Sequence, residues 1–330
     1  MKERIKMGKQ ITRREFIGST AAAAALSVLP RGVFGQVAIK PNSNFNGVQI
    51  GAITYSWRSM PSTADDLLNY LVQCGLSSVE LMDGPAEQFA GIPTFESVRM
   101  PRGTDVTEEQ RAKIQAARLA QSEQIRKWRL SVSMDNFKAL RKKYNDAGVD
   151  ICIVKFDNIG GSMTEAEIDY CFNVAKALGA KGITTELSEE NAKLLGPYAD
   201  KHKIMIGFHN HTRINSQSWE VPFSYGEYLG MNFDIGHYVA GTNESPIPII
   251  EKFADANRIL SLHIKDRKVN NGPNMPFGQG DTPLGLILLL MKRKKYTFPA
   301  HIELEYRIPE GSDAVAEVKK CVAYCKEVLA

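Results

Sequence analysis

Acidic side chains and a histidine recur near the ends of short apolar runs in the second half of the sequence: Glu186, Asp234, His263, Glu303 and Glu305. Apolar runs of this kind are typical of parallel strands that are buried on both faces. A charged side chain late in such a strand must face a polar cavity, because burying it without a partner is costly. Carboxylate oxygen and imidazole nitrogen together are ligands for a divalent metal. We therefore predict a site for one divalent ion (Mn, Mg, Co or Zn).

Two carboxylates in the last apolar run compete for one ligand position. Glu303 and Glu305 are two residues apart, so in a strand they share a face. We expect Glu305, nearer the end of the run, to be the ligand, with Glu303 as the alternative. Each candidate also has a purely structural interpretation: Glu186 could cap the helix that follows it, and His263 could be a hydrogen-bonded core histidine.

Further polar and aromatic residues close to these positions are candidates for substrate binding. His237 follows Asp234 by three residues and is expected to lie past the end of the strand, folded back over the site. Lys155 and Lys265 could instead be surface lysines whose aliphatic chains pack on the protein while the ammonium groups reach solvent. Tyr55 and Trp57 could instead pack in the core. The substrate-binding candidates are His209, His211, His237, Lys155, Lys265, Tyr55 and Trp57.

The elements that must position these residues form an eightfold pattern. Short runs rich in β-branched residues alternate with longer helical segments, which predicts parallel strands joined by helices. Eight such units predict a (β/α)8 TIM barrel, whose active site lies at the carboxyl ends of the strands. The segment 85–130 is a long insertion after the second strand and is a candidate lid. The expected strands are 47–57, 77–83, 150–157, 181–187, 204–211, 231–237, 260–266 and 300–306.

The first 35 residues are expected to be a targeting signal. "TRREFIG" (12–18) carries paired arginines and precedes an uncharged, alanine-rich stretch, which is typical of a twin-arginine (Tat) signal peptide, with cleavage expected after Gly35. We expect an exported, periplasmic protein, with the barrel spanning 36–330. No later segment is long enough for a permanent membrane anchor.

The charge balance of the barrel argues against a nucleic-acid partner. Residues 1–35 hold seven of the 41 basic and two of the 37 acidic residues, which leaves 34 basic and 35 acidic residues elsewhere. A nearly neutral body offers little phosphate neutralisation. The expected partner is a small carbohydrate substrate, and the sequence leaves a homo-oligomer open.

The ordered motifs "TTEL", "FDIGH", "LHIKD" and "ELEY" resemble those of the xylose isomerase-like TIM barrels, in the sugar phosphate isomerase/epimerase branch. That branch includes tagatose/psicose 3-epimerases, inosose dehydratase and hydroxypyruvate isomerase. The resemblance implies that Glu186, Asp234, His263 and Glu305 hold one divalent ion and that His237 touches the substrate. The arginine used by ketose 3-epimerases has no clean match, because Arg267 follows His263 too closely.

The resemblance implies a metal-dependent isomerase or epimerase. Glu186 or Glu305 would take a proton next to a carbonyl, giving a metal-stabilised enediolate. The alternative is a lyase or hydratase acting on 3-keto-glycosides or related oxidised sugars. A non-catalytic sugar-binding barrel is a weaker alternative.

Overall fold

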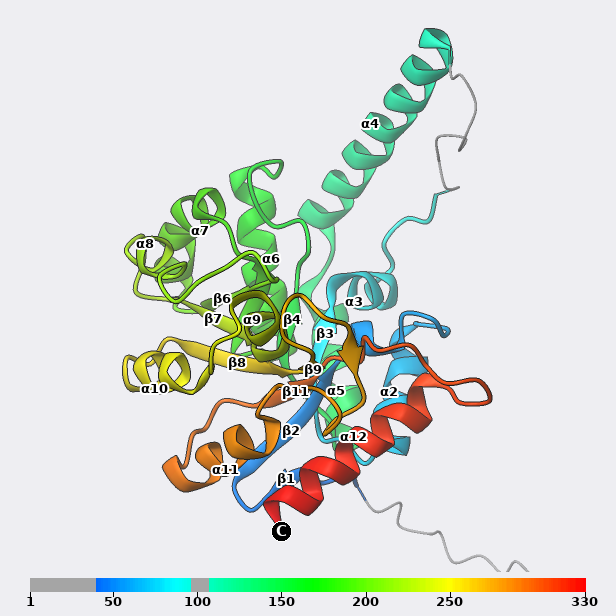
Figure 1. Cartoon of the computed structure of the whole chain (residues 1–330). Helices are drawn as coiled ribbons and strands as arrows, with labels where there is room; N and C mark the ends of the chain where they lie inside the picture. The colour runs from blue at the N-terminus through cyan, green and yellow to red at the C-terminus, as the bar shows by residue number, and fades with distance from the viewer. Residues whose placement is uncertain (1–39, 96–106) are drawn as a thin grey trace, which may run out of the picture. The chain divides into compact units, whose positions relative to one another are not determined.

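The computed structural model describes residues 40–95 and 107–330 and contains the predicted barrel. Eight parallel strands pair in the order β2-β11-β8-β7-β6-β5-β4-β3, and a further pairing of β2 with β3 closes the ring. Figure 1 shows these strands in the centre with helices around them. The barrel strands are β2 (Val48–Ile53), β3 (Ser78–Met82), β4 (Asp150–Lys155), β5 (Gly182–Glu186), β6 (Met205–His209), β7 (Leu229–Asp234), β8 (Ile259–Ile264) and β11 (Ala300–Ile302).

Three very short strands lie outside the barrel wall. β1 (Asn44–Phe45) pairs antiparallel with β2. β9 (Asp266–Arg267) and β10 (Asn274–Met275) pair with each other beyond the end of β8. None of the three takes part in the parallel pairing of the eight barrel strands.

Most of the helices lie between successive strands and bury apolar side chains against the barrel. Threonine capping boxes fix the starts of α2, α4 and α6, as the Ser/Thr signals in the sequence suggest. The helical elements are η1 (Thr54–Trp57), α2 (Ala64–Gln73), α3 (Asp83–Ala90), α4 (Glu108–Ser131), α5 (Met134–Asp146), α6 (Glu165–Leu178), α7 (Glu189–His202), α8 (Glu220–Phe223), α9 (Ile235–Thr242), α10 (Ile247–Asp255), α11 (Leu284–Lys294) and α12 (Ala314–Leu329).

The insertion between β3 and β4 contains α3, α4 and α5. α4 extends away from the barrel in Figure 1, and none of its residues is fully buried. Its two arginines near the C-terminal end contact α3 and α6: Arg129 binds Glu87, and Arg126 binds Glu167. The lid role remains a prediction.

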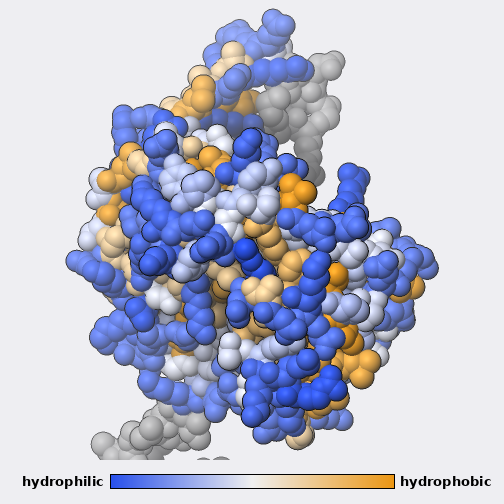
Figure 2. All heavy atoms as spheres, turned by 90° about the vertical axis from the view of Figure 1, so that its left-hand side faces the viewer, coloured by the Kyte–Doolittle hydropathy of each residue, from blue (hydrophilic) through white to orange (hydrophobic). Residues whose placement is uncertain are grey.

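Most buried apolar residues of the strands and helices form one large cluster, and Cys152, Ile153 and Leu260 form a small separate one. The face seen in Figure 2 is largely hydrophilic, with apolar side chains in small separate groups. None of the helices in the two described ranges has the length and hydropathy needed to cross a membrane.

Candidate active site

Asp234 links the end of a barrel strand to the start of a helix. It is the last residue of β7 and is fully buried. Its Oδ1 accepts a hydrogen bond of 2.6 Å from the backbone N–H of His237, so Asp234 is also the N-cap of α9. The three-residue spacing therefore crosses the strand–helix boundary. Asp234 stays in the barrel while His237 lies above it.

Four buried side chains form a group suited to a divalent cation. Ligand atoms of His209, Asp234, His263 and Glu303 all lie within 4.8 Å of one another. Nδ1 of His209 is buried without a hydrogen-bonded partner among the described residues, and the buried Oδ2 of Asp234 lies 3.0 Å from the ammonium of Lys265. Burial lowers the pKa of His209 well below its usual value, so its imidazole is neutral, the form that binds metals. Two imidazoles and two carboxylates fit an ion such as Zn or Mn.

His263 is held between two carboxylates. Its Nε2 lies 2.8 Å from Glu80 Oε2, and its Nδ1 lies 3.0 Å from Glu303 Oε2. Burial opposes a charge on this imidazole, but Glu80 and Glu303 raise the pKa of His263 to about 10. A carboxylate on the far nitrogen is the usual support of a metal-binding histidine, and Glu80 has that position.

Sequence reasoning did not identify Glu80. It lies inside the short strand β3, is fully buried, and also accepts hydrogen bonds from Thr184 and Asn232. Burial alone would raise its pKa, yet His263 and His301 hold the pKa of Glu80 below its usual range. The available signal was a lone glutamate in the apolar run "SVELM".

Lys265 lies at the centre of the acidic residues. Its Nζ is 3.0 Å from Asp234 Oδ2, 2.9 Å from Glu303 Oε2 and 2.6 Å from Glu305 Oε2. The side chain is 2% exposed. Burial would favour the neutral amine, but Asp234, Glu303 and Glu305 together raise the pKa of Lys265, which is therefore an ammonium.

The two candidate carboxylates of the last strand have different positions. β11 ends at Ile302, and His301 is level with His263 in the neighbouring strand. Glu303 is therefore the next inward-facing residue and joins the buried group, while Glu305 lies farther out. Glu303 is better placed than Glu305 to bind an ion in this group, because the side chain of Glu305 is more exposed to solvent, 21% against 7%.

Glu186 lies outside the four-residue group, at the edge of a cavity of about 200 Å³. Its Oε1 accepts a hydrogen bond of 2.8 Å from Lys155, and His211 Nε2 lies 2.9 Å from its Oε2. Burial would raise its pKa, but these cationic and donor neighbours hold the pKa of Glu186 below its usual range. The lining residues are Ile53, Tyr55, Met82, Lys155, Asp157, Glu186, His209, His211, Glu303 and Glu305.

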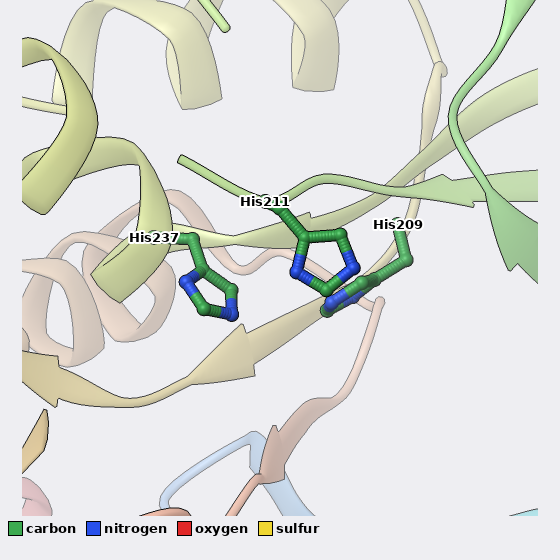
Figure 3. A group of neighbouring side chains, drawn as sticks. All are labelled: His209, His211 and His237. Carbon is green, nitrogen blue, oxygen red and sulfur yellow. The ribbon is translucent and has the colours of Figure 1, made fainter. Parts of the chain in front are cut away.

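Three histidines gather above this cavity. Figure 3 shows His209 and His211 at the end of β6 facing His237 of α9, and ligand atoms of the three lie within 4.8 Å of one another. His237 Nε2 lies 2.9 Å from Lys265 Nζ, and its Nδ1 lies 2.7 Å from Arg267 Nη1. Burial and these two cations lower the pKa of His237 to about 3. It is a neutral imidazole that can accept from one of the two cations.

Tyr55 and Trp57, both candidates for substrate binding, have different surroundings in the structure. β2 ends at Ile53, and residues 54–57 form the short helix η1, which breaks the two-residue alternation of a strand. Tyr55 lines the cavity. Trp57 is fully buried in the core, with its ring centroid 6.0 Å from that of Tyr70, so it cannot offer a wall to a substrate.

Several solved structures are similar to this chain in fold. A sugar phosphate isomerase/epimerase from Parabacteroides distasonis has a TM-score of 0.55 and 17% identity, covering 84% of this chain and 93% of that one. The 3-keto-D-glucoside 4-epimerase from E. coli has a TM-score of 0.54 and 12% identity, covering 85% and 99%. A probable 3-DHS dehydratase from Bacillus anthracis has a TM-score of 0.56 and 12% identity, covering 84% and 99%. No curated protein has a matching sequence.

At the level of sequence, the family described as xylose isomerase-like TIM barrel matches residues 69–327. This match covers well over half of the chain and includes every candidate ligand in the barrel mouth. Together with the closed ring of eight parallel strands, it shows that the chain belongs to the xylose isomerase-like TIM barrel family.

Proposed function

We propose that this chain is a sugar isomerase or epimerase that moves a proton at the carbon next to a carbonyl. One observation carries the proposal: Glu186 and Glu305 line the same cavity. Glu186 is the last residue of β5, and Glu305 follows the end of β11 by three residues. These are the fourth and eighth strands in a ring of eight, so we infer that the two carboxylates approach the cavity from opposite sides. Two carboxylates placed in this way can serve as base and acid on the two faces of one substrate carbon.

The cavity suits a small polar substrate. Its volume of about 200 Å³ is below the ~300–1,000 Å³ of pockets for drug-sized ligands. Lys155 and His211 flank Glu186 and can bind hydroxyl or carbonyl oxygens of a sugar. Tyr55 lines the same cavity, and the ring of His237 lies 5.0 Å from that of His211, another lining residue.

A divalent ion fits the buried group beneath the cavity. Asp234 and His263, with His209 and Glu303, would hold it, and it would supply polarisation of the substrate carbonyl. The family resemblance instead selects Glu186 and Glu305 beside Asp234 and His263. Both sets share Asp234 and His263, while the positions of Glu186 and Glu305 suit proton transfer.

The direction of proton return decides the reaction. Glu186 and Glu305 can each remove a proton from one face, and return by the opposite carboxylate inverts the carbon. Return to the neighbouring carbon gives isomerisation. A leaving group β to the deprotonated carbon would be expelled instead, which gives a lyase or hydratase. The 3-keto-glucoside epimerase and the dehydratase among the similar structures favour 3-keto-glycosides as the second candidate substrate class.

The test is solvent exchange of the substrate proton. The metal-loaded protein is incubated in D2O with a panel of ketoses and 3-keto-glycosides, and deuterium next to the carbonyl is followed by NMR. Glu305→Gln should abolish inversion and the exchange that Glu305 itself catalyses, whereas Glu310→Gln, on an exposed loop, should retain both. Signals of an unsaturated product would identify the lyase. Binding without exchange by any substrate would favour a non-catalytic sugar-binding barrel.

A further inference from the structure

The most unusual feature of the site is a buried lysine among the candidate metal ligands. Lys265 Nζ lies within 3.0 Å of oxygens from Asp234 and Glu303, two members of the group suited to a divalent ion. It also contacts Glu305 at 2.6 Å and His237 at 2.9 Å. The carboxylates thus already have a cation, provided by the chain itself.

An ion in this group and the ammonium of Lys265 would compete for the same oxygens. Carboxylate oxygens bind divalent ions at ~2.0–2.2 Å, and Nζ lies 2.9 Å from Glu303 Oε2. The two cations would therefore be at most about 5 Å apart in a buried site, where repulsion between charges is weakly screened. Lys265 cannot keep all of its present contacts when an ion is bound.

The charge of the cluster leaves room for both cations. Asp234, Glu303 and Glu305 contribute three negative charges and Lys265 one positive charge, and the pair of Glu80 with His263 adds no net positive charge to them, so at least two negative charges remain for a divalent ion. Lys265 also has a second place to bind. Glu305 and His237 lie on its outer side, and the side chain of Glu305 is 21% exposed, against 0% for Asp234.

We propose that Lys265 is an internal counter-ion that occupies the metal position and moves toward Glu305 and His237 when an ion binds. The inference rests on the proposed function, because it concerns the ion of that site. In the metal-free protein, Lys265 keeps the carboxylates together and lowers the affinity for metal. In the metal-bound protein, its ammonium lies nearer the substrate cavity, beside Glu305.

The first test measures metal affinity without substrate. Dissociation constants for Mn²⁺ and Zn²⁺ are determined by competition with a chromophoric chelator for wild type, Lys265→Met and Lys155→Met. Lys265→Met should bind about tenfold more tightly or better, because the competing charge is absent. Lys155 is also buried at the mouth, but it pairs with Glu186 and Asp157, so Lys155→Met controls for the loss of one charge and should change the affinity much less.

The second measurement does not depend on the variant being well folded. A crystal structure of the wild type soaked with Mn²⁺ should show Nζ beyond 3.5 Å from Asp234 Oδ2 and still bonded to Glu305. An ion bound with Nζ unmoved would overturn the inference, as would equal affinities of wild type and Lys265→Met. These results leave the proposed proton transfer intact. Absence of metal binding by every protein would overturn the inference together with the metal part of the proposed function.

Discussion

Glu80 is the residue on which the orientation of His263 depends. It is the carboxylate at Nε2, so it leaves Nδ1 facing Glu303 and the candidate metal position. Glu80 is fully buried, and the imidazoles of His263 and His301 that it contacts stabilise its charge. Replacing Glu80 therefore affects both the stability of the barrel and the geometry of the site.

We expect Glu80→Gln to weaken metal binding by ~10–100-fold, as loss of the carboxylate behind a metal-binding histidine usually does. It should also lower the free energy of unfolding by about 3 kcal/mol, because it breaks a buried ion pair and leaves His263 with one carboxylate, Glu303, instead of two. Chelator competition and urea denaturation measure the two effects. Glu317→Gln is the matched control: Glu317 is equally buried but binds Tyr306 and Lys320. It should lower stability without changing metal affinity, and equal affinity losses would contradict the role of Glu80.

Asp83 predicts a pH dependence of stability. Burial, with Glu87 and Asp157 nearby, raises the pKa of Asp83 from 3.8 to about 7. The folded protein therefore holds a proton that the unfolded chain releases, and the stability from this group is lost as pH rises from about 4 through 7. Asp83→Asn should be about 1–2 kcal/mol more stable than wild type at pH 8, with the difference disappearing near pH 4.

The measurement for Asp83 is urea denaturation at pH 4 and pH 8. Asp146→Asn, which removes an exposed carboxylate of α5, serves as the control. Its free energy of unfolding should change with pH as that of wild type does. If the free energies of unfolding of Asp83→Asn and wild type differ by the same amount at pH 4 and pH 8, Asp83 ionises normally in the folded protein.

At the scale of elements, a largely buried ion pair attaches α4 to α3, beside the ring contact of Trp128 with Tyr170 of α6. Arg129 binds both oxygens of Glu87 at 2.8 and 3.1 Å, with side chains 14% and 5% exposed. Arg129→Met should reduce the free energy of unfolding by about 3 kcal/mol, because Glu87 would remain buried without its partner. Arg126→Met removes a more exposed pair with Glu167 and should cost less than about 1 kcal/mol. Urea denaturation of the two variants compares them, and equal losses would argue against this attachment.

The strands could be predicted from sequence, but their ends could not. All eight apolar runs form barrel strands, because continuous β-branched segments have few other ways to be buried. The last four expected residues of "GVQIGAITYSW" instead lie in η1, and Trp57 is buried in the core. β11 stops at Ile302, and that end brings Glu303 rather than Glu305 into the buried group.

The site residues followed from sequence only where the residue type was unusual for its strand. Asp234 and His263 could be selected because a charged or polar group between apolar neighbours must face a cavity. The position of Lys265 between Asp234 and Glu303 depends on the register of β8 with both neighbouring strands, which a single sequence does not contain. Contacts across the barrel, such as that of Glu80 with His263, could not be predicted from the sequence for the same reason.

At the scale of the whole molecule, residues 40–330 form a compact unit apart from residues 1–39. The expected signal peptide lies in the latter segment, outside the described residues. A barrel with its own closed ring of strands and its own core needs no contribution from the signal to fold. This organisation suits twin-arginine export, in which the protein folds before it crosses the membrane.

We therefore expect the paired arginines to determine location but not stability. Arg13→Lys combined with Arg14→Lys should keep the precursor in the cytoplasm of a Tat-competent bacterium, whereas the wild type should reach the periplasm and lose about 35 residues. Cell fractionation with mass spectrometry of the processed N-terminus measures both. A chain beginning at residue 36 is the control: it should remain cytoplasmic and unfold at the same temperature as the processed protein. Periplasmic accumulation of the double variant would show that another signal directs this barrel.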